Sequence, residues 1–118
     1  MKRPGILIVT IDQQRWDELG ANGNAEIRTP VLDRLAAESV NLDHHVVQCP
    51  VCMPSRVSWL TGLYPSTLGI LGNGVPVPPD APTLPRLLKP YGYVCGNLGK
   101  LHFLPHANRD HREPHPDG

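Results

Sequence analysis

The sequence has no net charge, too few cysteines for a set of disulfides and no long apolar run. Its 11 basic side chains balance its 11 acidic ones, so no net field draws the chain to nucleic acid or to an anionic membrane surface. No segment approaches the roughly 20 consecutive apolar residues of a membrane span. Three cysteines do not make a disulfide framework, which favours a reducing compartment. We therefore expect no nucleic-acid partner and no membrane association, and binding must come from a local site.

The amino-terminal end also lacks the features of a secretory signal peptide. A short basic head precedes the apolar residues 6–11, a run shorter than the roughly 7–15 residues of a signal's apolar region. Asp12 follows this run, with no small-residue cleavage site. We expect a buried strand at this position and a cytoplasmic protein.

Glycine and proline are abundant, with 11 and 14 residues of 118. This share falls just short of the roughly 25–30% that is typical of low-complexity chains. A chain of this length forms one domain, or part of one, with a modest core of two packed layers. We interpret the sequence as a loop-rich globular chain.

The apolar pattern predicts an α/β fold. Residues 6–11 are a β-branched, nearly uninterrupted apolar run, typical of a strand covered on both faces in a parallel sheet. Thr29 as N-cap and Pro30 in the first turn predict a helix that reaches Val40. The remaining predicted elements are strands at residues 42–47 and 93–98, a helix from residue 54 or 55 to residue 63, a short helix between Thr83 and Gly92, and an extended tail or loop at residues 105–118. Helices would sandwich a mostly parallel sheet.

Polar side chains gather at the ends of these predicted elements. Asp12 follows the first strand, Cys52 precedes the second helix, and Lys100 and His102 follow the third strand. In doubly wound sheets, ligands bind beyond the carboxyl ends of the strands. The pattern predicts that these four side chains converge from three distant segments.

Each of these residues also has a simpler interpretation. Asp12 alone could end a strand or cap the following turn. Cys49 and Cys52 have the C-x-x-C spacing of a thiol-redox site, whereas a zinc site would need further ligands and there is no second such pair. One packed and one reactive cysteine is a further possibility. The other histidines are more simply explained without metal ligation. His44 and His45 fit a strand with side chains on opposite faces, and the tail histidines fit a solvated loop: His106, His111 and His115.

The wider stretch around Cys52 carries a resemblance to a known family. Residues 52–56 read C-M-P-S-R and residues 60–62 read L-T-G, which resembles the signature of the type I sulfatases of the alkaline-phosphatase-like superfamily. Three further segments are similar to the family's first strand, its T-P-x-L-D-x-L-A helix and its G-K-x-H motif: "ILIVTIDQQ", "TPVLDRLAAESV" and "GKLH". The resemblance runs from about residue 5 to residue 104.

The resemblance implies that Cys52 is oxidised after translation to formylglycine, an aldehyde that hydrates to a geminal diol. One hydroxyl attacks sulfur, and the other, once deprotonated, expels sulfate and regenerates the aldehyde. A sulfate monoester is anionic, so catalysis also needs cations and helix-end dipoles. A helix N-terminus suits Cys52, because its free backbone N–H groups favour anions.

Further site residues follow from the same resemblance. Arg56, one turn along the helix, would orient and stabilise the diol. The positively charged Lys100 would interact with the sulfate or the diol as a point charge, and His102 would take the proton of the second hydroxyl. Asn73, in the "LGNG" turn, would donate to a sulfate oxygen, although Asn-Gly alone indicates a turn.

The resemblance also implies a divalent metal. Asp12 supplies a hard carboxylate oxygen for the ion, which polarises the modified side chain of Cys52 and neutralises sulfate charge. Ca²⁺ is the expected metal, with Mg²⁺ or Mn²⁺ as alternatives. Many family members have two adjacent aspartates, whereas this chain has Asp12-Gln13. Gln13 either coordinates the ion through its amide oxygen or contacts the ligands without binding the ion. The expected ligands in this chain are Asp12, Gln13 and Cys52.

The family's remaining metal ligands lie far downstream of these motifs. We therefore expect residues 1–118 to be the amino-terminal part of a sulfatase catalytic domain, with an incomplete sheet. The expected partners are a sulfated small molecule or sulfated sugar and a formylglycine-generating or sulfatase-maturating enzyme. The alternatives are a phosphonate or phosphate monoester hydrolase of the same superfamily, an inactive truncated fragment, and a thiol-redox or interaction module that uses Cys49 and Cys52.

Overall fold

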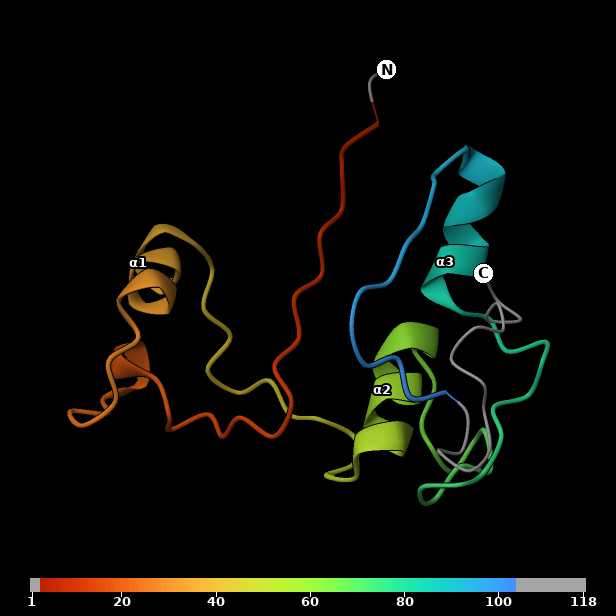
Figure 1. The fold of residues 1–118 in the computed structure, drawn as a ribbon, viewed down its shortest axis with the longest axis horizontal. Coiled ribbons are helices and arrows are strands. Elements are labelled where there is room, and N and C mark those ends of the chain that lie inside the picture. Colours follow the sequence, from red (N-terminus) through yellow and green to blue (C-terminus); the bar gives the residue numbers. More distant parts are fainter. Residues whose placement is uncertain (1–2, 104–118) are drawn as a thin grey trace. The chain divides into compact units, whose positions relative to one another are not determined.

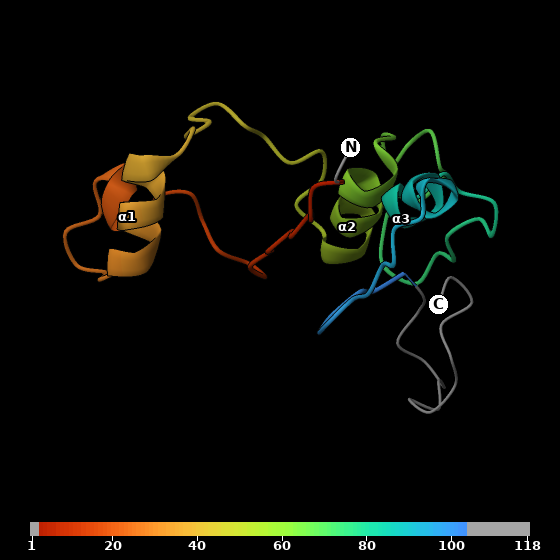
Figure 2. The same cartoon turned by 90° about the horizontal axis from the view of Figure 1, so that it is seen from above.

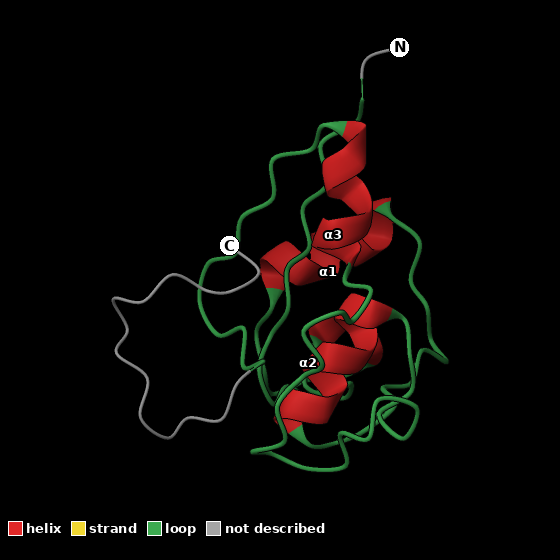
Figure 3. Ribbon diagram, turned by 90° about the vertical axis from the view of Figure 1, so that its right-hand side faces the viewer, coloured by secondary structure: helices red, strands yellow, loops and turns green. Residues whose placement is uncertain are grey.

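The computed structural model describes residues 3–103 and divides the chain into two compact units. The units are Met1–His45 and Val46–Gly118. In both, short helices are joined by long loops, and Figure 3 shows no strand among the residues that are described. No helix in this part of the chain combines the length and the apolar character that crossing a bilayer requires. The predicted tail at residues 105–118 lies outside the described residues.

The first unit is built on the helix α1 (Pro30–Glu38) and the short 3-10 helix η1 (Gly20–Asn22), which lie together in Figure 2. The backbone N–H of Gly20 donates to the Thr29 hydroxyl (2.9 Å), and that of Ala21 donates to the Asp33 carboxylate (2.8 Å). The Thr29 hydroxyl in turn donates to Asp33 (2.8 Å). The T-P-x-L-D segment therefore starts α1 and also satisfies the exposed N–H groups of η1.

An exposed ion pair precedes η1. Arg15 donates to both carboxylate oxygens of Asp17, at 2.9 and 2.5 Å. These hydrogen bonds lower the pKa of the Asp17 carboxyl below its ordinary value and raise the pKa of Arg15. Both side chains are solvent-accessible, so the pair contributes little to stability.

The second unit is built around α2 (Cys52–Thr61). One face of this helix is buried in a small apolar core formed by Met53, Val57, Leu60, Ile70 and Phe103. The helix ends at Gly62, whose φ of 70° is left-handed and whose N–H donates to the Ser58 carbonyl (2.8 Å). The L-T-G sequence is thus a helix stop, because glycine adopts this conformation without a Cβ clash.

A shorter helical segment follows in the same unit. It consists of α3 (Leu84–Leu88) and the 3-10 helix η2 (Lys89–Tyr91), and it ends at Gly92 with a φ of 78°. Thr83 lies at the predicted N-cap position, although its side chain makes no capping hydrogen bond. The chain then runs on in an extended form, drawn in blue in Figure 1, and reaches α2 again near residue 100.

The three predicted helices are confirmed, with shifted ends. The helix α1 starts at Pro30 as expected but ends at Glu38, before Val40. The helix α2 begins at Cys52 rather than at residue 54 or 55, because a proline in the first turn has no N–H to lose there. It ends at Thr61, two residues before the predicted residue 63, because Gly62 is its left-handed C-cap.

The predicted sheet is not confirmed. Residues 6–11, 42–47 and 93–98 form no strand in the structure, and most of their apolar side chains are exposed, with Leu7 at 87% and Val94 and Leu98 at 100%. A parallel strand needs hydrogen-bonding neighbours and cover on both faces. The described residues provide no paired strands and no covering layers for these segments, so their strong β propensity alone does not form a sheet.

Neighbouring residues 70 and 71 allow a matched test of the core. Ile70 is fully buried and Leu71 is 73% exposed. We expect Ile70→Ala to lower the free energy of unfolding of the second unit by about 2–5 kcal/mol, because it removes packing and leaves a cavity. Leu71→Ala should change it by less than about 0.5 kcal/mol. Urea unfolding followed by circular dichroism measures both, and equal effects would place Ile70 outside the core.

Candidate functional site

Cys52 is the first residue of α2. Val51 before it is extended (φ −87°, ψ 133°), and the first helical hydrogen bond runs from the Ser55 N–H to the Val51 carbonyl (3.0 Å). Cys52 is half-buried, whereas Met53 and Pro54 beside it are buried. The thiol therefore sits at the end of the helix where backbone N–H groups lack intrahelical partners and where the helix dipole favours anions.

Asn73 caps this helix from a distant loop. Its side-chain Oδ1 accepts a hydrogen bond from the Met53 backbone N–H at 3.2 Å and lies 3.4 Å from the Cys52 Sγ. A backbone N–H can only donate, so the amide oxygen of Asn73, and not its nitrogen, must face Met53. The Nδ2 group is the other end of the same amide and is a donor.

Arg56 joins α2 to the segment that carries Lys100 and His102. The Arg56 side chain is only 8% exposed, and its Nη1 donates to the Lys100 backbone carbonyl. Charge-assisted hydrogen bonds of this kind are among the stronger ones. The predicted helix arginine is thus a buried contact between two motifs that lie 44 residues apart in the sequence.

His102 is held in an unusual conformation. It is 9% exposed, and Phe103 next to it is part of the apolar core. Its φ of 58° is left-handed, which costs energy for a residue with a Cβ and is seen mainly where the surroundings enforce it. Lys100 is exposed. The second unit therefore brings together Cys52, Asn73, Arg56 and the backbone of residues 100–103.

The predicted metal ligands are divided between the two units. Asp12 and Gln13 belong to the first unit and are exposed, and Gln13 has a φ of 58°, whereas Cys52 belongs to the second. Ca²⁺ takes about six to eight oxygen ligands. Among residues 3–103 no group of three or more His, Cys, Asp or Glu side chains could hold a metal ion. Asp12 and Gln13 offer oxygen donors of the right kind, but too few to form a complete site.

In the described part of the chain, the cysteines form no disulfide and the remaining histidines join no metal-binding group. Cys49, Cys52 and Cys95 are all free cysteines. His44 and His45 are exposed, and the predicted tail histidines lie outside the described residues. The redox hypothesis for Cys49 and Cys52 remains a prediction.

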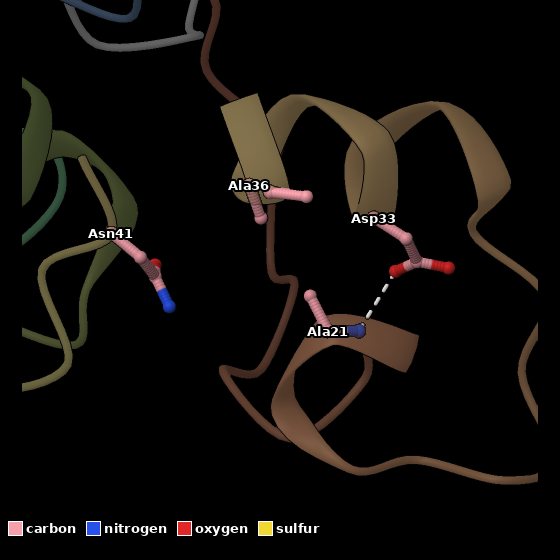
Figure 4. Close-up of a pocket in the computed structure, with 5 residues that line it drawn as sticks. Ala21, Asp33, Ala36 and Asn41 are labelled. Carbon is pink, nitrogen blue, oxygen red and sulfur yellow. Dashed lines mark hydrogen bonds between the residues drawn. The ribbon is translucent and has the colours of Figure 1, made fainter. Parts of the chain in front are cut away.

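Two features were not foreseen from the sequence. The capping of α2 by Asn73 has no local signal, since the two segments are about 20 residues apart. A shallow pocket in the first unit is lined by alanines with Asp33 and Asn41 (Figure 4). The hydrogen bond from Ala21 to Asp33 lies at this pocket. None of the predicted site residues lines it.

Comparison with known proteins identifies the family to which this sequence belongs. The sequence profile of the sulfatase family matches residues 4–114. The chain belongs to the sulfatase family. This membership confirms the resemblance and implies the α/β fold that the apolar pattern also predicts, although no sheet is formed in the described residues. Sulfatases use a formylglycine and a divalent metal.

Individual sulfatases match over most of the chain. A steryl-sulfatase from Mus musculus is 39% identical over 111 residues, which cover 85% of this chain and 18% of the relative. An ulvan-active sulfatase from Formosa agariphila is 38% identical over 104 residues, covering 88% and 20%. Arylsulfatase H from Canis lupus familiaris is 36% identical over 127 residues, covering 97% and 23%. The chain thus spans about a fifth of the length of these relatives. No solved structure matches it.

The contact between Arg56 and Lys100 predicts a local loss of order when it is removed. Arg56→Ala should speed amide hydrogen exchange in residues 100–103, by an amount equivalent to about 1–3 kcal/mol, because the Lys100 carbonyl loses a charged donor. Arg86→Ala is the control, since Arg86 donates to another carbonyl, that of Ala81 (3.3 Å). If both variants leave exchange at residues 100–103 unchanged, Arg56 does not hold this segment of the sulfatase chain.

Proposed function

We propose that this chain supplies the nucleophile of a sulfatase that hydrolyses sulfate monoesters to an alcohol and sulfate. The observation that carries the proposal is the position of Cys52, which is the first residue of α2 and the first residue of the C-x-P-S-R motif. Formylglycine at this residue supplies an oxygen nucleophile that can later be released from sulfate. The chain's own residues would bind the anion and move the protons.

The helix start provides the first part of an anion site. The N–H groups of the first turn and the α2 dipole favour a negatively charged sulfate beside residue 52. Arg56 joins the Lys100 backbone to this helix, and in the proposal the Lys100 ammonium would act on a sulfate oxygen as a point charge. The Asn73 amide, with its oxygen turned toward Met53, leaves Nδ2 as a donor for sulfate.

His102 is proposed as the proton acceptor of the site. A histidine suits this task at neutral pH, because its ordinary pKa lies near 6.5. The rigid setting of His102 beside Phe103 in the core would keep the imidazole in one place during turnover. Its left-handed backbone is consistent with a conformation retained for function rather than for stability.

Asp12 and Gln13 are proposed as part of the metal site, with Ca²⁺ as the expected ion. A carboxylate and an amide oxygen are donors that hard divalent cations prefer. The bound ion would polarise the nucleophile and neutralise sulfate charge. The modified side chain of Cys52 would supply a further oxygen ligand, and the ion would need others beyond these three residues.

Two partners follow from this proposal. The substrate is a sulfated small molecule or a sulfated sugar, in line with relatives named for steryl and ulvan sulfates. The second partner is a maturation enzyme that recognises the segment around Cys52. Conversion of the thiol to an aldehyde is a two-electron oxidation with loss of the sulfur, so that enzyme must couple it to an external electron acceptor.

Conversion of Cys52 can be measured with an internal control. Trypsin cleaves after Arg34 and Arg56, and the peptide between them contains both Cys49 and Cys52. After expression with a maturation enzyme, tandem mass spectrometry should show an aldehyde at Cys52 and an intact thiol at Cys49. Arg56→Lys should reduce conversion, because it alters the recognised motif. An unmodified Cys52 in the co-expressed chain would contradict the proposal.

The Asp12-Gln13 pair favours phosphonate or phosphate esters as a second candidate substrate class. An amide in place of a second carboxylate makes the site less negative by one charge, which suits the dianion of a phosphate monoester. A phosphonate monoester carries one negative charge, as a sulfate monoester does, so for phosphonates the Asp-Gln pair is supported by the family resemblance alone. Lys100 and His102 of the G-K-x-H motif favour sulfate.

We expect the chain, expressed within its full reading frame, to turn over an aryl sulfate at least about tenfold faster than the matching phosphonate. This ratio corresponds to about 1.4 kcal/mol in transition-state stabilisation. The reverse preference would assign the second class.

A further inference from the structure

We propose that Asn73 is a positioning residue that holds the side chain of residue 52 through one fixed hydrogen-bond acceptor. In the modified protein, this acceptor favours the hydrated form of formylglycine over the bare aldehyde. The inference rests on the proposed function, because it concerns the group into which Cys52 is converted. It assigns Asn73 a task that does not require contact with substrate.

The acceptor is fixed by the backbone of the helix it faces. The same Asn73 Oδ1 accepts from the Met53 N–H (3.2 Å) and faces the Cys52 Sγ (3.4 Å). A carbonyl oxygen has two lone pairs, so it can serve both donors at once. Met53 is fully buried in the core, and rotation of the amide would place Nδ2 against the Met53 donor. The oxygen therefore stays where it is whatever side chain residue 52 carries.

The loop geometry also restrains Asn73. Gly74 after it has a φ of 91°, a conformation that residues with a Cβ rarely adopt. The partly buried Val77 then packs against the core that contains Met53. The loop is thus anchored close to the helix start, and Asn73 is presented to α2 from a turn that only glycine completes without strain.

A fixed acceptor discriminates between the possible forms of residue 52. A thiol has an S–H that can donate to Asn73. The aldehyde oxygen of formylglycine can only accept, and beside Oδ1 it would meet a second acceptor. Addition of water across the aldehyde gives two hydroxyl groups on one carbon, and one of these can donate to Oδ1 as the thiol does. No oxidant or reductant is needed for this step, because one water is added and nothing else changes.

The size of the preference is that of one hydrogen bond. A typical net contribution is of order 1 kcal/mol, which corresponds to a change of about three- to tenfold in the ratio of hydrate to aldehyde. Such a shift would keep residue 52 in the form that carries a nucleophilic hydroxyl between turnovers. Asn73 would therefore act through residue 52, and its loss should lower the amount of active nucleophile.

The ratio can be read directly by NMR in the full chain. Labelling cysteine with ¹³C at Cβ before maturation gives signals from three positions, Cys49, Cys52 and Cys95. Aldehyde and hydrate carbons have well-separated shifts, so residue 52 reports both forms. We expect Asn73→Ala to lower the ratio of hydrate to aldehyde by about three- to tenfold. Asn73→Asp, which keeps an acceptor of the same size, should retain the ratio or raise it.

A matched control separates this effect from general loosening. Asn97 is an exposed asparagine of the second unit whose Nδ2 donates to the Gly99 carbonyl (3.3 Å), and Asn97→Ala should leave the ratio unchanged. If Cys52 is converted and Asn73→Ala leaves the ratio unchanged, the inference is overturned while the proposed function stands. If Asn97→Ala shifts the ratio as much as Asn73→Ala, the inference is overturned as well.

Measurements on the unmodified chain keep the test independent of maturation. Amides in the first turn of an uncapped helix exchange rapidly, so the inference predicts slower exchange for the Met53 amide than for the Cys52 amide in the unaltered chain. Asn73→Ala should abolish this difference, and Asn73→Asp should restore it. Equal exchange at the two amides of the unaltered chain would overturn the inference, even if Asn73→Ala fails to fold. Failure of Cys52 to convert would instead count against the proposed function.

Discussion

The site depends on the burial of one face of α2. Met53, Val57 and Leu60 repeat at helical spacing and pack against Ile70 and Phe103. A helix is a rigid element, so fixing this face also fixes the direction in which its first turn points. Cys52 lies directly before the buried Met53 and is itself half-buried. The apolar core thus decides both where the thiol lies and that it stays accessible.

Two polar contacts connect the candidate site residues to α2. Asn73 reaches the start of α2 from one loop, and Arg56 reaches from the middle of α2 to the Lys100 carbonyl. Each contact joins segments at least 20 residues apart, and in each a side chain from one segment bonds to a backbone group of the other. The Asn73 amide thus lies beside residue 52, and the segment that carries the Lys100 cation and His102 is joined to the same helix. An anionic ester needs such surroundings before an oxygen nucleophile can approach it.

Local sequence signals predicted the helices and the family better than the tertiary arrangement. Pro30, Gly62 and Gly92 mark helix ends through backbone geometry alone, and the C-x-P-S-R motif pointed to the family that comparison then confirmed. The predicted start of α2 at residue 54 or 55 lies two or three residues after the observed start at Cys52, because Pro54 belongs to the first turn and does not begin it. Capping by Asn73 could not be predicted, since its partner is a backbone N–H about 20 residues away. The expected sheet needs pairing partners that the described residues do not supply, and apolar pattern alone does not form a sheet.

The claim that α2, Asn73 and the core hold residue 52 ready for conversion and catalysis is tested most directly by a crystal structure of the chain after co-expression with a maturation enzyme. The account predicts two oxygen atoms on the Cβ of residue 52 in place of sulfur. One of them should lie within hydrogen-bonding distance of the Asn73 Oδ1 that also accepts from the Met53 N–H. An intact cysteine sulfur, or an Asn73 side chain turned away from the start of α2, would contradict it.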